Sequence, residues 1–470
     1  MKLAILGYGA EGKCVEKYFK SHPYENVPPK DIEIKVFDNF KDEEIDSLGL
    51  EKYDVVFRSP SVRPHYDFKK FSTEENHLSN EDRYKLEFKK PYWTSATKYF
   101  FEHCPCEIIA VTGTKGKGTT CSMITEILNA ISEHSFANTD GGSPRTFLVG
   151  NIGVPALEVL DKLSPIDNVV YEMSSFQLWD LHQGSFVGVM LRIEPDHLNV
   201  HKDFEDYIYA KSAVSRYKTG NDFLIYFHNN ETTKNLAEKS IAKKISYPLS
   251  EKNAETPKLS KKANDNLSTL LESLTVPGKH NRENAEAALL AVAARYCNGD
   301  LEELLTGKLY PALQHAFKNF KGLPHRIEFV RELNHVLYYD DNYSTTFPSI
   351  DVAIETFKDK PTILIAGGKD KGTDISDIKQ KIFSSKNIKK VVLIGETAKN
   401  LAENEPSSKY EFADSLDDAV LRAKLLAEKC VNENNHQAVV LMSPAFASFD
   451  MFKSYGERGD LFKEYVNALK

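Results

Sequence analysis

The chain has 470 residues, which is long for a single hydrophobic core, so we expect about two to four domains. Its 60 basic and 68 acidic residues give a net charge of −8, which argues against a general nucleic-acid binder because such a protein needs a basic surface. No window approaches the roughly 20 apolar residues of a membrane span, and the N-terminal stretch does not resemble a signal peptide. Six cysteines do not suggest a disulfide framework in a chain of this size, and Cys104 and Cys106 beside His103 lack a second ligand pair at zinc-finger spacing. We therefore expect a cytoplasmic monomer with no nucleic-acid or membrane partner.

The first segment predicts a Rossmann-like unit. A strand over residues 2–6 runs into Gly7-Tyr8-Gly9-Ala10-Glu11-Gly12, a helix follows, and a second strand ends on Asp38. This G-x-G-x-x-G spacing is typical of diphosphate binding, but it does not separate a dinucleotide from a sugar nucleotide. For either ligand, the glycines would lie under the diphosphate and Asp38 or Asn39 would face the base or ribose. A third strand over residues 54–57 runs into the loop Arg58-Ser59-Pro60-Ser61, and the polar residues 66–95 predict a helix and a connection.

The second domain, beginning near residue 99, is organised around a phosphate-binding loop. A strand over residues 109–112 passes into Gly113-Thr114-Lys115-Gly116-Lys117-Gly118-Thr119-Thr120, and a helix follows. In such a loop the backbone N–H groups and the helix dipole attract phosphate, Lys117 can bridge the outer phosphates, and a hydroxyl can hold Mg²⁺. The pattern differs from G-x-x-x-x-G-K-[ST] because Gly118 precedes the hydroxyl of Thr119. A turn that only joins a strand to a helix would not need two lysines and three hydroxyls, so we interpret the loop as a nucleoside triphosphate site.

Two later strand ends in this domain carry acidic residues. The strand over residues 168–171 ends in Glu172, which is either a Walker-B-type ligand of Mg²⁺ or a glutamate facing water. The strand over residues 187–193 ends in two carboxylates and two histidines within residues 194–201, which is either a polar site or a solvated loop. The following helix, over residues 203–216, carries Lys211, which on composition alone is an ordinary surface lysine.

The last third of the chain predicts another α/β unit. An alanine-rich helix opens with Asn281 and Asn284, which lie three residues apart and face one direction, whereas an N-cap explains only one of them. From near residue 323, four apolar strands alternate with helices, which is the pattern of a parallel sheet. The predicted fold is α/β with mainly parallel sheets and three domains: a Rossmann-like domain at 1–98, a P-loop ATPase-type domain at 99–321 and a Rossmann-like domain at 322–470.

The ordered motifs resemble those of the Mur ligase family over nearly the whole chain. They are the loop at 113–120, Asn151-Ile152-Gly153, Glu172 with Ser174 to Gln177, Asp196-His197, Lys211, His280-Asn281-x-x-Asn284, His325-Arg326, Asp340-Asp341, Gly367-Gly368 and Ser443-Pro444-Ala445-x-Ala447-Ser448-x-Asp450. The final block resembles that of the D-glutamate-adding branch. The resemblance implies a step of peptidoglycan synthesis in which ATP phosphorylates the carboxylate of UDP-N-acetylmuramoyl-L-alanine and the amine of D-glutamate attacks the acyl phosphate.

The resemblance also implies residue roles. ATP would contact the 113–120 loop, Asn281, Asn284, Arg326 and Asp341; the UDP-sugar would contact Gly7, Gly9, Asp38, Asn39, Ser59, Asn151, Ser174 and Gln177; D-glutamate would contact Lys371, Ser448, Phe449 and Tyr455. Thr119 and Glu172 would hold one Mg²⁺, and His197 with a carbamylated Lys211 would hold a second. Lys117, Glu172, His197 and Lys211 form the expected catalytic set.

Some positions depart from the family pattern, and two rival functions remain open. Tyr343 stands where a substrate-binding lysine is usual, and Ser61, Asn199 and Gly118 also differ. A rival enzyme is a folylpolyglutamate synthase or another Mur ligase that adds a different amino acid, which the final block disfavours. A rival from another class is a non-catalytic binder of ATP or a sugar nucleotide, which would not need a second metal site.

Overall fold

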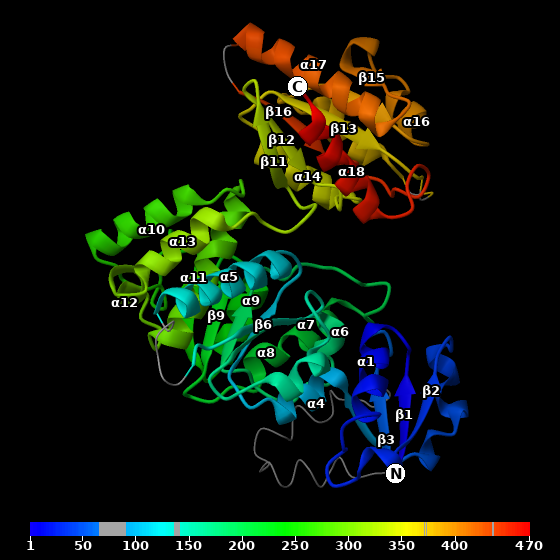
Figure 1. Cartoon of the computed structure of the whole chain (residues 1–470), viewed down its shortest axis with the longest axis vertical. Helices are drawn as coiled ribbons and strands as arrows, with labels where there is room; N and C mark the ends of the chain where they lie inside the picture. Colours follow the sequence, from blue (N-terminus) through cyan, green and yellow to red (C-terminus); the bar gives the residue numbers. More distant parts are fainter. Residues whose placement is uncertain (65–90, 136–141, 371, 373, 435–436) are drawn as a thin grey trace. The chain divides into compact units, whose positions relative to one another are not determined.

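The computed structural model describes residues 1–64, 91–135, 142–370, 372, 374–434 and 437–470. These residues form one four-stranded and two six-stranded sheets, which are mostly parallel and covered by helices, as the sequence predicts (Figure 1). They make two compact units: Met1–Leu271 with Glu283–Ala316, and Glu272–Arg282 with Phe317–Lys470. No helix among the described residues is both long and apolar enough to cross a membrane. The α/β prediction is confirmed, and the boundaries at residues 98 and 321 stay predictions.

The first sheet is parallel and has the strand order β2-β1-β3-β4. Its strands are β1 (Lys2–Leu6), β2 (Glu33–Phe37), β3 (Val55–Arg58) and β4 (Tyr92–Ser95), with helix α1 (Ala10–Phe19) after β1. The connection expected over 66–95 is wrong at its end, because Tyr92, Trp93 and Thr94 favour an extended backbone and pair with β3. The rest of that segment lies almost wholly outside the described residues.

The central sheet contains six parallel strands in the order β10-β9-β8-β5-β7-β6. They are β5 (Ile108–Thr112), β6 (Thr146–Gly150), β7 (Asn168–Glu172), β8 (Val187–Met190), β9 (Phe223–Phe227) and β10 (Lys243–Tyr247). Every residue of β5 is buried, and β5 pairs with β7 on one side and β8 on the other. Because the carboxyl ends of parallel strands meet at one edge, the segments that follow β5, β7 and β8 meet there.

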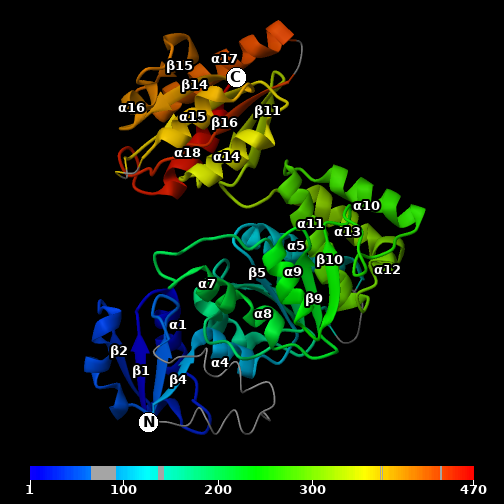
Figure 2. The same cartoon turned by 180° about the vertical axis from the view of Figure 1, so that it is seen from behind.

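The helices of this part of the chain connect or flank the strands of the central sheet. They are α4 (Ala96–His103), α5 (Lys117–Ser135), α6 (Ser175–Leu178), α7 (Phe204–Lys211), α8 (Ala213–Arg216), α9 (Glu231–Glu238), α10 (Lys261–Ser273), α11 (Lys279–Tyr296), α12 (Leu301–Thr306) and α13 (Tyr310–Asn319). Helices α5, α8 and α9 pack on strands of the central sheet (Figure 2). The single helix expected over 203–216 is divided at Ser212, whose hydroxyl donates to the carbonyl of Tyr209 at 2.7 Å. Such side-chain bonds to the backbone compete with regular helix.

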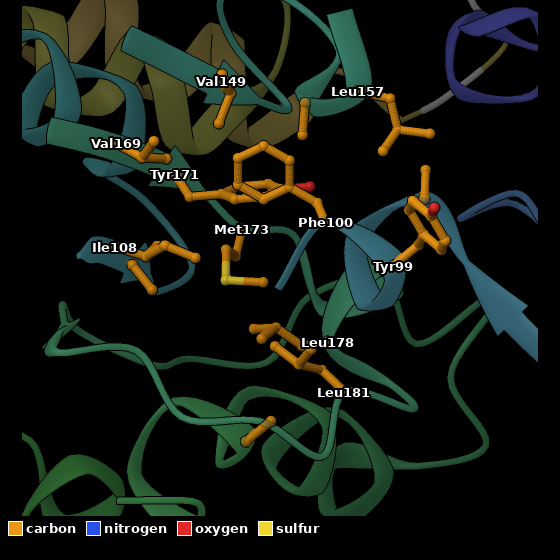
Figure 3. Packing of buried hydrophobic residues seen from close by; sticks show 14 of the residues in the cluster. Tyr99, Phe100, Ile108, Val149, Leu157, Val169, Tyr171, Met173, Leu178 and Leu181 are labelled. Atoms are coloured by element: carbon orange, nitrogen blue, oxygen red, sulfur yellow. The ribbon is translucent and has the colours of Figure 1, made fainter. Parts of the chain in front are cut away.

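One hydrophobic cluster joins the first sheet, α4 and the central sheet. Figure 3 shows Phe100 of α4 against Tyr171 of β7, with Met173 beyond it, and the two rings make an edge-on contact with centroids 5.7 Å apart. Tyr99, on the same helix, packs on the rings of α1 and β3. Helix α4 therefore packs against both the first sheet and β7 of the central sheet.

The third sheet has the order β11-β12-β16-β13-β14-β15 and is parallel except for its first strand. Its strands are β11 (Glu328–Leu333), β12 (Val336–Asp340), β13 (Thr362–Gly367), β14 (Ile388–Ile394), β15 (Tyr410–Phe412) and β16 (Ala438–Met442). Helices α14 (Phe347–Thr356), α15 (Ser376–Ser384) and α16 (Ala398–Ala402) share one core with the sheet, and α17 (Leu416–Asn434) and α18 (Tyr455–Ala468) share the other.

Candidate functional site

The loop after β5 has a backbone shape that only glycines accept. Gly116 has φ +85°, and a Cβ there would lie 2.6 Å from Oδ1 of Asn284. Gly113 has φ +150°, and its Cβ would lie 2.6 Å from the Cβ of Leu191. Asn284, on α11, therefore lies against the phosphate-binding loop. The side-chain amide of Asn281 donates instead to the carbonyl of Pro277 at 2.7 Å.

Positive charge and helix geometry meet at the start of α5. Helix α5 begins at Lys117, whose Nζ donates to the carbonyls of Gly113 and Thr114 at 3.0 Å each. The hydroxyl of Thr120 is buried and has no hydrogen-bond partner among the described residues. Unpaired N–H groups of a first helical turn and a lysine ammonium together attract phosphate oxygens. The geometry fits the predicted role of the loop.

Thr114 ties the loop to the segment after β8. Its hydroxyl donates to the carbonyl of Glu194 at 3.0 Å and accepts from the backbone N–H of Glu194 at 2.9 Å. The phenol of Tyr207 lies 3.0 Å from the same hydroxyl. Sequence analysis did not identify Tyr207, because a tyrosine within a helix carries no motif that separates this contact from ordinary packing.

Lys211 is not a surface lysine, so the interpretation from composition is wrong. Only 1% of it is exposed, and its Nζ donates to the carbonyl of Gly113 at 2.7 Å and to Oγ1 of Thr112 at 3.3 Å. Burial holds the pKa of Lys211 well below its usual range, and the charge of Lys117 lowers it further, while Asp196 and Glu172 act in the opposite direction. A buried amine with a lowered pKa is a nucleophile rather than a fixed cation.

Glu172 is buried at the end of β7, which excludes the interpretation that it faces water. It pairs in register with Val111 of β5, and its Oε1 accepts from the side-chain amide of Asn151 at 3.0 Å. This contact brings together two residues that the sequence analysis named separately. A buried carboxylate beside a phosphate-binding loop is the type of oxygen donor that Mg²⁺ accepts.

The two histidines after β8 have different surroundings. The side chain of His197 is 49% exposed, has Nε2 3.7 Å from Oδ2 of Asp196, and has φ +54°. His201 is buried, with Nδ1 3.1 Å from Oδ2 of Asp206 and Nε2 2.9 Å from Oγ of Ser175. Burial lowers the pKa of His201, although Asp206 opposes that shift. The segment is therefore solvated at His197 and part of the core at His201. The sequence analysis treated the whole segment as either a polar site or a solvated loop and did not distinguish the two histidines.

The glycine loop of the first sheet is held by a serine hydroxyl and an aspartate carboxylate. Gly7 has φ +83°, and a Cβ on Gly12 would lie 2.2 Å from the Gly7 carbonyl. The Ser59 hydroxyl donates to that carbonyl at 2.6 Å, and Asp38 accepts from the backbone N–H of Tyr8 at 3.1 Å. A Cβ on Gly9 would meet nothing within 4 Å. Asp38 and Ser59 thus fix the shape of the loop, and the space next to Gly9 is open.

Two polar contacts join the first sheet and its helix α1 to α6 and the turn after it. Gln177 caps α6 together with Ser174, and its Nε2 donates to Oε1 of Glu11 at 2.6 Å. Arg58 and Asp180 form a buried ion pair, with Nε of Arg58 2.7 Å from Oδ2 of Asp180. Ser174 and Gln177 therefore lie beside the helix that follows the first glycine loop. Asn39, the other residue expected near the base, has φ +58° directly after β2.

The end of β12 in the second unit carries a buried carboxylate. Oδ2 of Asp341 accepts from the Ser443 hydroxyl at 2.7 Å, and Oδ1 accepts from the N–H of Ile327 at 3.2 Å. Burial raises the pKa of Asp341 to about 7.

The guanidinium of Arg326 lies 5.9 Å from the ring centroid of Tyr343. Tyr343, which replaces the usual lysine, thus contacts another residue of the family pattern.

The residues expected near D-glutamate differ in exposure. Ser448 has a buried hydroxyl without a hydrogen-bond partner among the described residues, whereas Phe449 is 58% exposed. The ring of Tyr455 lies 5.1 Å from that of Phe449. Lys371 lies outside the described residues. Arg458, which is fully buried, donates to the carbonyls of Phe446 and Ala447 at 3.0 and 3.2 Å and so fixes this segment.

Within the part of the chain that the structure describes, one group of three histidine, cysteine or acidic side chains has metal-like spacing: His325, Glu328 and Asp340. These residues already have partners. Nδ1 of His325 lies 2.6 Å from Oδ2 of Asp340, and Oε2 of Glu328 accepts from the N–H of His325 at 2.8 Å and lies 3.2 Å from Nζ of Lys463. The group therefore explains how the segment before β11 is held without a metal ion.

Sequence comparisons match most of the chain to one family. The family model of the Mur ligase middle domain matches residues 111–292, and that of the Mur ligase glutamate ligase domain matches residues 325–446. The UDP-N-acetylmuramoylalanine–D-glutamate ligase of Clostridium kluyveri is 30% identical over 492 residues, covering 100% of this chain and 97% of the relative. The enzyme of that name from Acetivibrio thermocellus is 32% identical over 505 residues, with the same coverage.

Solved structures share the fold at lower identity. MurF from Acinetobacter baumannii gives a TM-score of 0.54 at 17% identity and covers 78% of this chain and 79% of its own. The UDP-N-acetylmuramate–alanine ligase MurC from Thermotoga maritima gives 0.52 at 16% identity and covers all of both chains. The folylpolyglutamate synthase of Mycobacterium tuberculosis complexed with ADP gives 0.51 at 12% identity and covers 81% of this chain and 97% of its own.

Proposed function

The chain belongs to the Mur ligase family and is an ATP-dependent ligase of peptidoglycan precursor synthesis, and from this premise we propose that it adds D-glutamate to UDP-N-acetylmuramoyl-L-alanine. In the proposed reaction the γ-phosphate of ATP passes to the L-alanyl carboxylate, and the amine of D-glutamate then displaces phosphate from the acyl phosphate to form the amide. The observation that carries this choice is the similarity along the whole chain to relatives named for D-glutamate addition.

We propose three functional domains on the three sheets. Residues 1–98 would bind the UDP-sugar, 99–321 would bind ATP, and 322–470 would bind D-glutamate. The open space above Gly9 suits a diphosphate, and Asn39, Asn151, Ser174 and Gln177 would serve the remainder of the UDP-sugar. Asn281, Asn284, Arg326 and Asp341 would contact ATP. Ser448, Phe449, Tyr455 and Lys371 would surround D-glutamate.

The central loop would carry the phosphoryl-transfer chemistry. The ammonium of Lys117 and the first N–H groups of α5 would stabilise the charge that develops on the phosphoryl oxygens. The donor set fits a hard cation, because Glu172 offers a buried carboxylate and Thr119 a hydroxyl. Bound Mg²⁺ would neutralise charge on the phosphates.

A second Mg²⁺ would be held by His197 and Lys211, provided that Lys211 is a carbamate. As an amine, Lys211 donates to the carbonyl of Gly113 and has no carboxylate oxygen to offer a cation. Its burial and the nearby Lys117 lower the pKa of the amine, which favours the neutral form that adds CO₂. The described surroundings of Lys211 therefore support carbamylation, while the exposed His197 would supply the second ligand.

An amino-acid panel tests the proposal. Phosphate release would be measured with ATP, UDP-N-acetylmuramoyl-L-alanine and one of D-glutamate, L-glutamate, L-lysine or meso-diaminopimelate, and product formation would be confirmed by mass. We expect turnover with D-glutamate alone, because each amino acid must place its carboxylates and amine against fixed groups. Equal or faster turnover with another amino acid, or with a folate acceptor in place of the UDP-sugar, would favour the rival ligases. ATP binding without any amide product would favour the non-catalytic rival.

A further inference from the structure

Two cysteines face each other in the short connection between α4 and β5. Cys104 follows α4 directly, Cys106 precedes β5, and their Sγ atoms lie 3.7 Å apart. Both side chains are partly buried at the edge of the cluster that joins the first sheet to the central sheet, and Pro105 between them is exposed. Neither thiol belongs to the proposed active site.

The spacing of the two residues along the backbone is compatible with a bond between their sulfurs. Cys104 has φ −66° and ψ 121°, which is extended, and proline fixes φ of the next residue near the same value. The 3.7 Å between the Sγ atoms shows that the two side chains face each other. At about 3.1 Å per residue, the two Cα atoms are about 6 Å apart, which lies within the roughly 4.4–6.8 Å range of disulfides. The sulfurs would have to approach from 3.7 Å to the roughly 2.05 Å of a disulfide bond.

The thiols also differ in reactivity. The S–H of Cys106 is within reach of the Cys104 sulfur, and this hydrogen bond lowers the pKa of Cys104 while it raises that of Cys106. All six cysteines lie within the described residues, and the pKa values of the other four, Cys14, Cys121, Cys297 and Cys430, are raised, with burial as the largest cause. The pair therefore contains one thiol suited to attack a disulfide and a second held beside it.

We propose that Cys104 and Cys106 form a reversible dithiol–disulfide pair that exchanges with low-molecular-weight disulfides. The thiolate of Cys104 attacks one sulfur of glutathione disulfide, so that a mixed disulfide forms and one glutathione thiolate leaves. The thiol of Cys106 then loses its proton to water and attacks the Cys104 sulfur, which releases the second glutathione thiolate. The protein gives up two electrons and two protons, and glutathione disulfide is reduced to two molecules of glutathione.

Such a disulfide would close the turn immediately before the strand that carries the phosphate-binding loop. The pair lies at the amino end of β5, whereas the loop begins after Thr112 at the carboxyl end. A partly exposed disulfide is open to attack by reducing thiols, so excess reduced glutathione should reopen it. The site is thus a candidate for reversible oxidative modification outside the catalytic residues.

The test is thiol counting and intact mass after incubation of the native full-length protein with glutathione disulfide, followed by acid quenching and denaturation. We expect the number of free thiols to fall from six by two, with loss of two hydrogens, no added glutathione, and a cross-linked peptide that contains residues 104 and 106. Excess reduced glutathione should restore all six thiols.

Three single variants sharpen this test. C104S should lose reactivity at the pair, C106S should stop at a persistent mixed disulfide on Cys104, and C430S, which removes another partly buried cysteine, should behave as the native chain. Thermal unfolding checks that each variant is folded. Retention of all six thiols in the native protein, a persistent glutathione adduct on it, or a cross-link that reduced glutathione does not reopen would each overturn the proposal.

Discussion

The two glycine loops of the first compact unit share a plan and differ in charge. Each follows an inner strand of a parallel sheet, β1 or β5, and each leads into a helix. The loop at Gly7 is held by the Ser59 hydroxyl and the Asp38 carboxylate, and no lysine lies within it. In the loop at Gly113, the carbonyl of Gly113 accepts from the ammonium of Lys117 and from Nζ of the buried Lys211.

This difference shows how one backbone plan can serve two tasks. Backbone N–H groups alone can hold a diphosphate that does not react, because its charge is the same before and after the reaction. A phosphoryl group in transfer spreads new charge over its oxygens, and that charge needs a cation placed beforehand. We therefore expect substitutions at the second loop to affect rate and substitutions at the first to affect binding.

The largest effect is expected for Lys117→Ala. Loss of this charge should lower phosphate release by at least ~10²-fold in a folded protein, because a charge on the transferring oxygens contributes several kcal/mol in a closed site. Lys13→Ala is the matched control, since Lys13 is exposed on the helix that follows the first loop. Steady-state kinetics measure both, and near-normal turnover of Lys117→Ala would remove the contrast between the loops.

Lys211→Ala should also be nearly inactive, with a drop of about 10²-fold or more that a short carboxylic acid in the buffer partly reverses. The added acid would supply the oxygens of the missing carbamate. Lys218→Ala is the control, because Lys218 is a second buried lysine whose pKa is lowered by burial to about 7 but which donates to the Ser185 hydroxyl at 2.9 Å. Rescue of both variants, or of neither, would contradict a specific role for a carbamate at Lys211.

Arg58→Met should destabilise the link between the two sheets by about 3–5 kcal/mol, because it removes the guanidinium from a buried ion pair with Asp180. Urea unfolding followed by far-UV circular dichroism measures the loss. The double variant Arg58→Met with Asp180→Leu should recover much of it, since two apolar groups replace the ion pair. If the single variant unfolds at the native midpoint, the pair does not hold the two sheets together.

The smallest expected effect is that of Gly9→Ala, which should raise KM for the UDP-sugar about tenfold and leave kcat and KM for ATP unchanged. Gly9 has φ −71°, so alanine fits the backbone, and the methyl would enter only the open space above the loop. Gly220→Ala also adds a methyl in open space, away from both loops, and serves as the control. A change in the ATP parameters instead would assign the first loop to the wrong ligand.

The sequence allowed much of the fold to be predicted because its strands are short apolar runs that end in glycine or polar residues. It missed β4 because Tyr92–Ser95 follows a long polar stretch, and it missed β11, an edge strand whose residues are mostly half-exposed. Both strands gain their stability from a neighbouring strand rather than from their own hydrophobic pattern. Pairing between distant segments is not visible in local periodicity.

Site residues could be predicted where the residue type and spacing are tied to one chemical role. They were harder to predict where the role of a residue depends on its surroundings in the fold. The glycines and Lys117 of the loop after β5 follow a spacing that has a mechanism. The burial of Lys211 depends on how α7 packs on β5, and the burial of His201 depends on its contacts with Asp206 and Ser175. The residue types alone do not encode these contacts. The ligand contact of Ser59 stays a prediction, and its hydrogen bond to the Gly7 carbonyl is visible only in the folded backbone.

The central position of β5 has a consequence for amide hydrogen exchange. Ile109 and Ala110 are paired with β7 on one side and β8 on the other, and both are buried. Their amide protons should exchange with solvent deuterium only through opening of the whole sheet, which makes them among the slowest in the unit. A few residues further along, the amide proton of the exposed Lys115 should exchange quickly, because local fluctuations of the loop are enough to expose it to solvent. A deuterium-uptake profile should therefore change abruptly across Gly113, at the point where the rigid strand becomes the loop.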